Sequence, residues 1–317
     1  MNRERIAFFG SPPLAHACLE ELHRSFTIPL VVTQPDREKG RGRKVSMTPV
    51  KTYALEHGLA VYQSPDQGAR LVDVLREHGI TLIVVVAFGR MLQEQIIVFP
   101  KCGSLNLHAS LLPKYRGPSP IEAAILGGER ETGVTLQHMA VDMDRGALLD
   151  SENVVIEGSW TAENLYEKIV DISPPFLSRS VKNYFEGRLE PVEQDEASAS
   201  YCKVIQKKDG YIDWQEAADP IRNKIRAYNL WPVAYSFLQG RQLKLYNAQI
   251  VEALSNIRGD DVPGQVVSAD KGQGIIVKTG RGYLGITDLQ MENRRRMDHR
   301  EFMNGHKDLE GSVLGAQ

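Results

Sequence analysis

The chain has 317 residues, of which 42% are hydrophobic and 25% charged, and its formal net charge is −2 at pH 7. This length predicts two domains with a sizeable core in at least one, and the charge excludes a globally basic nucleic-acid binder but not a local basic patch. No apolar run is long enough to span a membrane, and the run at residues 6–9 is too short for a secretory signal. Cys18, Cys102 and Cys202 are widely spaced, which indicates neither a disulfide framework nor a zinc site and favours the cytoplasm.

The beginning of the chain predicts the opening of a parallel α/β sheet. Residues 5–10 form an apolar run that ends at glycine, as is typical of a strand buried on both faces. Two prolines then favour the start of a helix, and residues 28–33 form a second apolar run. The dinucleotide fingerprint GxGxxG is absent, and Thr33 and Gln34 stand where an acid would end the second strand. We therefore do not expect a nicotinamide site.

Residues 34–51 carry six basic side chains and only two acids. Connections between a strand and a helix usually have about 2–6 residues, and long loops in α/β domains are often functional. We favour a contact with the phosphates of a nucleic acid, with a solvated surface loop as the alternative. The basic residues are Arg37, Lys39, Arg41, Arg43, Lys44 and Lys51.

A central strand is predicted at residues 82–86, after helices at residues 48–57 and 69–78. It ends in a turn at residues 87–92 that contains Gly89. Ligands of open α/β sheets lie beyond the carboxyl ends of the strands. We therefore expect this turn near the end of the next strand, although a simple strand–helix connection explains the same residues.

Residues 104–118 combine a short strand with a loop. Leu105 and Leu107 alternate with Asn106 and His108, which predicts a strand whose amide and imidazole lie on one face. Prolines and a glycine then end the regular structure. Two hydrogen-bonding side chains at such a junction predict an active site.

The following segments predict a helix at residues 120–126 and two antiparallel strands at 132–139 and 147–156, joined by an acidic loop. This loop brings a carboxylate back over the end of the sheet. A helical region then opens at Thr161, and we expect it to break at Ser173–Pro175 because proline interrupts helices.

Residues 186–208 shift in composition toward glycine, proline, acids and an Ala-Ser repeat, which is typical of a linker. A short helix and five short β-like runs follow and predict a small barrel, OB-like in size. The strands are expected at residues 234–238, 242–250, 264–268, 274–279 and 283–289. The predicted architecture is a Rossmann-like, doubly wound, parallel-rich α/β domain at 1–188, a linker at 189–207 and a β-barrel domain at 208–317.

Asn106, His108 and one acid suit chemistry at a carbonyl without a protein nucleophile. The amide and the imidazole stabilise an oxyanion, and the acid orients the imidazole or moves a proton. No GxSxG elbow is present, and no second histidine lies at ligand spacing, so we expect no metal. A structural histidine is the alternative for His108 taken alone.

The run LNLHASLLPKYRG, followed by HMAVDMDRG, resembles the formyltransferases that use 10-formyltetrahydrofolate. The resemblance implies a catalytic triad of Asn106, His108 and Asp144. It also implies that the folate formyl donor binds along three segments. These segments contribute Ala87, Phe88, Gly89 and Met91; Ser110, Leu111, Leu112 and Pro113; and Met139 and Val141.

Three positions differ from the usual pattern of that family. The family usually has an acid at Ala140, a small hydroxyl residue at Arg145 and a proline at Gln93. Asp144 is kept, so the expected reaction is unchanged, and Arg145 is expected to narrow or charge the folate pocket.

The segment TQPDREKGRGRK resembles the insertion by which methionyl-tRNA formyltransferases contact the acceptor arm, with Arg41 as the foremost contact. KKDGYIDW and IRAYNLWPVAY resemble the carboxy-terminal domain of that subfamily, which adds RNA contacts. The resemblance implies formyl transfer to the α-amino group of initiator methionyl-tRNA. We expect a monomer in the cytoplasm. The alternatives are a sugar-nucleotide formyltransferase and an RNA-binding relative that has lost catalysis. The implied tRNA contacts are Arg37, Arg41, Arg43, Lys44, Lys207 and Lys208.

Overall fold

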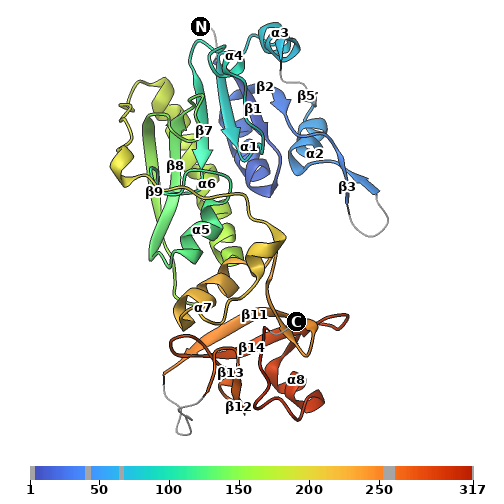
Figure 1. Ribbon diagram of the computed structural model, residues 1–317. Coiled ribbons are helices and arrows are strands. Elements are labelled where there is room, and N and C mark those ends of the chain that lie inside the picture. Colours follow the sequence, from blue (N-terminus) through green and yellow to red (C-terminus); the bar gives the residue numbers. More distant parts are fainter. Residues whose placement is uncertain (1–3, 40–43, 64–67, 253–260, 316–317) are drawn as a thin grey trace. The chain divides into compact units, whose positions relative to one another are not determined.

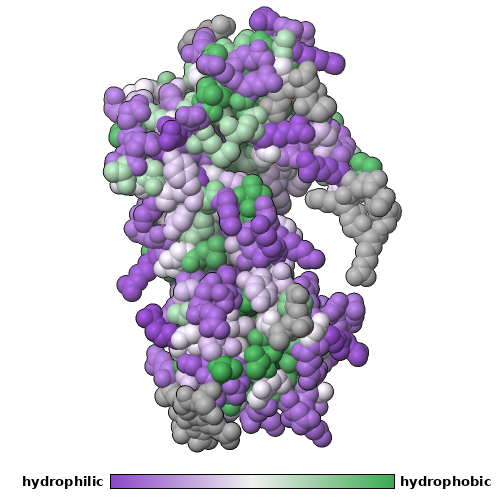
Figure 2. All heavy atoms as spheres, viewed as in Figure 1, coloured by the Kyte–Doolittle hydropathy of each residue, from purple (hydrophilic) through white to green (hydrophobic). Residues whose placement is uncertain are grey.

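The computed structural model of the chain describes residues 4–39, 44–63, 68–252 and 261–315. These residues form two compact units. The first unit comprises Met1–Pro120, Glu131–Val155 and Tyr166–Lys203, and the second comprises Ile121–Arg130, Ile156–Leu165 and Val204–Gln317. In the described part of the chain, no helix is both long and apolar enough to cross a membrane. The face drawn in Figure 2 is mostly hydrophilic, with small apolar patches.

The first unit is built on a seven-stranded sheet in the order β5-β2-β1-β6-β7-β8-β9 (Figure 1). The pairs from β5 to β7 are parallel, whereas β8 runs antiparallel to both β7 and β9. The strands are β1 (Arg5–Gly10), β2 (Thr27–Val32), β5 (Ala60–Tyr62), β6 (Leu82–Val86), β7 (Ser104–His108), β8 (Glu131–His138) and β9 (Leu148–Val155). The predicted parallel-rich sheet with an antiparallel edge is therefore confirmed.

Helices connect these strands. Every residue of β6 is buried, as are Ile6–Phe9 of β1, because side chains of a parallel sheet are covered on both faces. The α2 helix begins after Thr48, whose hydroxyl accepts a hydrogen bond from the Lys51 amide and so caps the helix. The helices are α1 (Pro13–Ser25), α2 (Pro49–Glu56), α3 (Ala69–Glu77), α4 (Glu94–Ile97), α5 (Pro120–Leu126) and α6 (Ala162–Phe185).

The predicted break in the α6 region is wrong, because α6 continues through Pro174 and Pro175. Each proline removes one backbone hydrogen bond of the helix. The Ser173 hydroxyl donates to the Ile169 carbonyl at 2.6 Å, which adds a contact just before the prolines. Residues on both sides of the prolines, including Ile169 and Phe176, are fully buried. Packing therefore holds the helix together where local preference would end it.

The basic segment at residues 34–51 contains regular structure that we did not predict. It forms a short antiparallel hairpin of β3 (Arg37–Lys39) and β4 (Lys44–Ser46), in which Arg37 pairs with Ser46 and Lys39 with Lys44. The tip of the hairpin lies outside the described residues.

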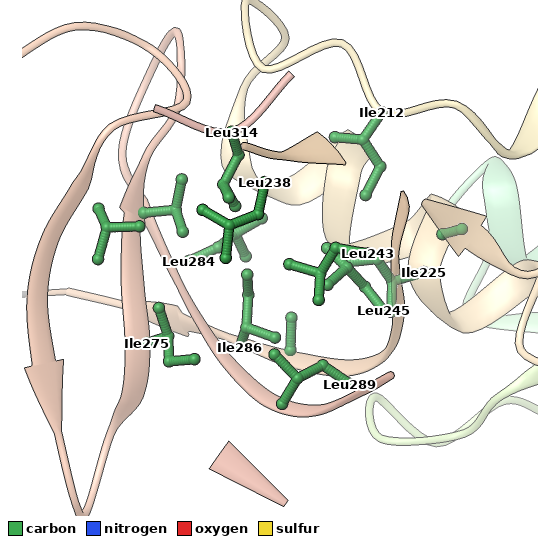
Figure 3. Close-up of a cluster of buried hydrophobic side chains, with 14 of the residues drawn as sticks. Ile212, Ile225, Leu238, Leu243, Leu245, Ile275, Leu284, Ile286, Leu289 and Leu314 are labelled. Carbon is green, nitrogen blue, oxygen red and sulfur yellow. The ribbon is translucent and has the colours of Figure 1, made fainter. Parts of the chain in front are cut away.

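The second unit contains an antiparallel sheet whose pairing follows the order β10-β11-β14-β13-β12, with β15 on β14. The five predicted strands correspond to β10 (Ala234–Leu238), β11 (Arg241–Val251), β12 (Val266–Asp270), β13 (Gly274–Lys278) and β14 (Tyr283–Met291). The unit also has β15 (Met297–Asp298), α7 (Ala218–Ala227) and α8 (His299–Gly305). Figure 3 shows leucine and isoleucine side chains from the strands and α7 pointing toward one another in its core, among them Ile225, Leu245 and Ile286.

The start of the predicted linker is hydrogen-bonded to the first unit. The backbones of Leu148 and Val192 exchange two hydrogen bonds of 2.8 and 2.9 Å along β9. Further on, Arg116 and Tyr201 form an isolated parallel bridge. This part of the chain is thus an ordered component of the first unit.

Replacing Gly133 by alanine should destabilise the first unit. An added Cβ at Gly133 on β8 would lie 2.1 Å from the carbonyl oxygen of Glu152 and 2.7 Å from a methyl carbon of Leu111. Overpacking of this kind costs about 1–3 kcal/mol, so Gly133→Ala should lower the free energy of unfolding measured in urea by that amount. The matched control is Gly158→Ala, because a Cβ there meets no heavy atom within 4 Å. Equal stabilities of the two variants would contradict the prediction.

Candidate active site

The two polar side chains of β7 lie beside a carboxylate from the loop between β8 and β9. Asn106 and His108 alternate with buried leucines along β7, and so lie on the same face of the sheet. The Asn106 amide nitrogen Nδ2 donates to Asp144 Oδ1 at 3.3 Å. His108 Nδ1 lies 3.6 Å from Asp144 Oδ2, and the two side chains are only 7% and 10% exposed. The loop therefore folds back onto β7 and brings together the three residues that the motifs predicted.

Two further groups hold the Asp144 carboxylate. The backbone N–H of Gly117 donates to Oδ2 at 2.8 Å, and Gln137 Nε2 donates to Oδ1 at 3.1 Å. A buried carboxylate is costly unless its oxygens are hydrogen-bonded, and these contacts meet that need. Gln137 was missed in the sequence, although it pairs with Asn106 across β7 and β8.

The orientation of the His108 ring follows from its second nitrogen. His108 Nε2 lies 3.0 Å from the carbonyl oxygen of Tyr115. A carbonyl only accepts hydrogen bonds, so Nε2 carries the hydrogen. Nδ1 is then the nitrogen that faces Asp144. The contact with Tyr115 thus sets the orientation of the ring.

The backbone of Asp144 is in the left-handed region, with φ of 56°. This conformation costs about 1 kcal/mol for a residue that carries a Cβ, although Asp adopts it more readily than most. Gln194 Nε2 donates to the carbonyl oxygens of Asp144 and Gly146 at 2.8 Å each. Gln194 lies in the segment that composition predicted as a linker, and nothing in its polar surroundings marked it as part of a site.

The predicted folate segments follow the carboxyl ends of β6, β7 and β8. Because β8 runs antiparallel to β7, its last residue, His138, lies opposite Leu105 near the start of β7. The turn after β6 has two residues with positive φ, Ala87 and Gly89, and exposes the side chain of Met91 by 54%. Phe88 is buried in the core cluster of the sheet, and Met139 packs against the same cluster. In the loop after β8, Val141 is 56% exposed. Exposed apolar side chains of this kind fit an aromatic ligand, because covering apolar surface lowers the free energy of the complex.

The turn after β7 is held by hydrogen bonds from Thr135 on β8. The Thr135 hydroxyl donates to the Ser110 carbonyl at 2.7 Å and accepts from the Leu112 amide at 3.1 Å. The Ser110 hydroxyl donates to the Lys114 carbonyl at 2.6 Å. Ser110 and Leu112 are buried, while Leu111 and Pro113 are partly exposed. Ser110 thus uses its hydroxyl to shape the turn.

The base of the β3–β4 hairpin is tied to the turn after β6. Gln34 Nε2 donates to the Phe88 carbonyl at 2.7 Å, and Lys51 pairs with Asp36 at 2.6 Å. A hydrogen bond from Gln63 and the contact with Lys51 lower the pKa of Asp36. Lys51, one of the six basic residues, therefore serves to anchor the hairpin.

The predicted tRNA contacts fall in both units. Arg37 is exposed, Lys44 belongs to β4, and Arg41 and Arg43 lie outside the described residues. Lys207 and Lys208 are exposed on a 3₁₀ turn (Lys207–Gly210) of the second unit.

Two of the positions that depart from the family pattern have defined local roles. Gln93 is the N-cap residue of α4. The Arg145 guanidinium lies 3.5 Å from Asp142, 3.3 Å from Glu196 and 3.2 Å from the Tyr201 hydroxyl. Its charge is therefore paired with two carboxylates.

Within residues 4–39, 44–63, 68–252 and 261–315, no group of three or more histidine, cysteine, aspartate or glutamate side chains could hold a metal ion. An open pocket of about 520 Å³ lies elsewhere, between α1 and α2. None of its lining residues belongs to the predicted site. They are Glu20, His23, Arg24, Tyr53 and His57.

Comparisons with known proteins cover almost the whole chain. Residues 4–181 match the family model described as formyl transferase, and residues 204–307 match the model described as formyl transferase, C-terminal domain. A methionyl-tRNA formyltransferase of Caldanaerobacter subterraneus subsp. tengcongensis is 40% identical over 98% of this chain and 99% of its own. One of Pseudoalteromonas translucida is 38% identical over 98% and 97%. In fold, the chain is similar to WlaRD, a sugar 3N-formyl transferase solved in the presence of dTDP and 5-N-formyl-THF. That likeness has a TM-score of 0.67 and 18% identity over 93% of this chain and 100% of WlaRD.

Acid should destabilise the first unit through His138, the last residue of β8. Its Nε2 atom is buried without a hydrogen-bond partner, and burial lowers the pKa of the ring. The unfolded chain therefore takes up a proton on this residue before the folded chain does, and stability falls as the pH drops below about 6.5. We expect His138→Gln to reduce the loss of Tm between pH 7.5 and 5.5. The control is His78→Gln, because His78 is the C-cap residue of α3 and lies outside β8. Equal losses of Tm in wild type and His138→Gln would refute the prediction.

Proposed function

The chain belongs to the formyl transferase family, and we propose that it transfers the formyl group of 10-formyltetrahydrofolate to the α-amino group of initiator methionyl-tRNA. The observation that carries the proposal is the cluster of Asn106, His108 and Asp144, in which a buried carboxylate lies beside an amide and an imidazole. Curated relatives of nearly full length are methionyl-tRNA formyltransferases, and the product is the formylmethionyl-tRNA of translation initiation.

In the proposed reaction, the free amine of methionine attacks the formyl carbon of the folate. A new C–N bond forms, and the carbonyl oxygen becomes an oxyanion that Asn106 Nδ2 stabilises. For the His108 ring to donate to it as well, its Nε2–H must leave the Tyr115 carbonyl when the substrate binds. Asp144 accepts the proton that leaves the amine, directly or through water. The oxyanion then re-forms the carbonyl as the bond between the formyl carbon and the folate N10 breaks, and N10 takes up the proton held by Asp144, directly or through water, as tetrahydrofolate leaves.

The folate formyl donor is proposed to bind along the turn after β6, the turn after β7 and the loop after β8. The residues are Ala87, Phe88, Gly89, Met91, Ser110, Leu111, Leu112, Pro113, Met139 and Val141. Met91 and Val141 supply exposed apolar surface for the rings of the folate. The backbone of the turn after β6, with its positive φ angles, is proposed to face a polar edge of the ligand, although its Phe88 carbonyl already accepts a hydrogen bond from Gln34.

The tRNA is proposed to contact the β3–β4 hairpin through Arg37, Arg41, Arg43 and Lys44, and the second unit through Lys207 and Lys208. Cationic side chains bind phosphates and release counterions, so affinity for tRNA falls steeply as salt rises. At the base of the hairpin, Lys51 is paired with Asp36. We further propose that the protein is a cytoplasmic monomer, as its tRNA substrate and its three free cysteines favour.

The proposal is tested by a formyl-transfer assay with the purified chain, 10-formyltetrahydrofolate and methionyl-tRNA. A parallel reaction with an amino-sugar nucleotide separates the competing function, because the formyl transferase core is common to both. We expect formylmethionyl-tRNA and no formylated sugar. Formylation of the sugar nucleotide alone would overturn the proposed acceptor.

Removing a triad side chain should lower the rate without unfolding the protein. Loss of one hydrogen-bond donor to an oxyanion typically costs about 10²–10³ in rate. We expect His108→Ala and Asn106→Ala each to reduce kcat by about that factor, with unchanged circular dichroism. A wild-type rate in His108→Ala would refute the catalytic assignment.

Arg41→Ala should weaken tRNA binding and leave folate binding unchanged. A charge-assisted hydrogen bond contributes about 1.5–3 kcal/mol, so KM for tRNA should rise roughly tenfold or more. The slope of log K for tRNA binding against log salt concentration should decrease in magnitude by about 1. Arg188→Ala is the control, because Arg188 is an exposed arginine outside the proposed contacts. An unchanged KM for tRNA in Arg41→Ala would contradict the role.

A further inference from the structure

The segment that follows α6 contributes one side chain to the candidate active site. Gln194 is half-buried between exposed neighbours, and its Nε2 atom lies 2.8 Å from the carbonyl oxygens of Asp144 and Gly146. These two carbonyls flank Arg145 at the point where the loop turns. We infer that Gln194 is a positioning residue that holds Asp144 in its reactive orientation. This inference rests on the proposed function.

Gln194 contacts the backbone of Asp144 directly and is connected to its side chain through Gln137. Its Nε2 atom also lies 3.3 Å from Gln137 Oε1, and Gln137 Nε2 in turn donates to Asp144 Oδ1. Asp144 has a left-handed backbone, a conformation that persists only where surrounding contacts hold it. The two backbone hydrogen bonds from Gln194 supply such contacts at Asp144 itself and two residues later.

Arg116 fixes which way the Gln194 amide points. Its Nε and Nη2 atoms donate to Gln194 Oε1 at 3.0 and 2.9 Å. A guanidinium can only donate hydrogen bonds, so the oxygen of the amide must face Arg116 and the NH₂ group must face the loop. The assignment of oxygen and nitrogen in this amide is thus determined by its partners.

Arg116 is itself held rigidly. Its side chain is 1% exposed, and it donates to both carboxylate oxygens of Glu196, at 3.0 and 2.8 Å, and to the Tyr201 hydroxyl at 3.0 Å. The Glu196 carboxylate raises the pKa of Arg116, and Arg116 lowers that of Glu196. A bidentate pair of this kind gives a defined geometry.

The same short stretch of chain holds the carboxylate from the other side. Gly117, the residue after Arg116, donates its backbone N–H to Asp144 Oδ2. The backbone of Arg116 is bonded on both sides, with its N–H donating to the Ser200 carbonyl at 2.9 Å and its carbonyl accepting from Cys202 at 2.8 Å. The segment around residues 194–202 therefore fixes Asp144 through Gln194 and, through Arg116, the donor at Gly117.

Two substitutions test whether Gln194 positions Asp144 or only attaches the segment at residues 194–202 to the rest of the unit. Gln194→Ala removes the contacts to the loop and to Arg116. Gln194→Glu keeps the size of the side chain and an acceptor for Arg116, but an ionised carboxylate cannot donate to the two carbonyls. If Gln194 only attached the segment, Gln194→Glu would behave as wild type. If it positions Asp144, both variants lose rate.

We expect both variants to lower kcat by about 10- to 100-fold, since small misplacements of a catalytic group have effects of that size. KM for the folate and for tRNA should change less than threefold, and Tm of Gln194→Glu should stay near that of wild type. The control is Glu193→Gln, an exposed neighbour, which should have wild-type kinetics. In an Asp144→Ala background, Gln194→Ala should cause no further loss, because its effect passes through Asp144.

Hydrogen exchange gives a readout that does not depend on activity. Amides of residues 139–147 should exchange faster in Gln194→Glu than in wild type. Wild-type kcat in Gln194→Glu, or unchanged exchange in this loop, would overturn the inference while leaving the formyl transfer intact. A wild-type chain that cannot formylate methionyl-tRNA would instead overturn the proposed function, and the exchange measurement would still decide the role of Gln194.

Discussion

A carboxylate removed from water must find hydrogen-bond donors, and much of the first unit is arranged to supply them to Asp144. Asn106 comes from β7, Gln137 from β8, and the Gly117 amide from the loop that follows β7. Desolvation of an unpaired carboxylate would be prohibitive, so these contacts form together or the loop does not close. The order of strands makes this possible, because β7 is paired with both β6 and β8. Because β8 runs antiparallel to β7, the loop between β8 and β9 can fold back onto the face of β7 that carries Asn106 and His108.

A second constraint joins the hairpin to the proposed folate turn. The Gln34 side chain donates to the Phe88 carbonyl, and a Cβ added to Gly89 would lie 2.5 Å from the same amide nitrogen. Gly89 has φ of 75°, so the backbone angle favours glycine there, and a Cβ would displace the Gln34 amide from its present position. Gln63 Nε2 donates to the Gln34 carbonyl at 2.6 Å and to Asp36 at 2.9 Å. The proposed tRNA-binding hairpin and the proposed folate turn therefore share one hydrogen-bonded base.

Periodicity predicted the longer strands of both units, but not β3, β4 and β5, which have only three residues each. Asn106 and His108 could be placed on one face because side chains alternate along a strand, and the apolar runs at β1 and β6 identified the buried strands. Gln194 could not be found in this way. Its role depends on contacts with residues about 50 positions away in the sequence, and a polar, proline-containing segment has the same composition whether it is free or bound. The predicted break at the prolines of α6 was wrong for a related reason. Ile169 and Phe176 are buried by tertiary packing, and this packing outweighs the local preference of proline to end a helix.

The two arginines near Asp144 are paired with groups other than its carboxylate. Arg145 is adjacent in sequence, yet its guanidinium binds Asp142, Glu196 and Tyr201. Arg116 precedes Gly117, whose amide binds Asp144, yet its own guanidinium donates hydrogen bonds to Gln194, Glu196 and Tyr201. The two arginines together lower the pKa of the Tyr201 phenol, with Arg145 as the larger influence.

A guanidinium bound to Asp144 would form a strong, bidentate pair and would compete with the incoming amine for the same oxygens. Among the described residues, the hydrogen bonds to Asp144 come instead from two side-chain amides and one backbone amide. Neutral donors of this kind orient a carboxylate without neutralising it, which suits the proposed role of Asp144 as the acceptor of a proton from the attacking amine.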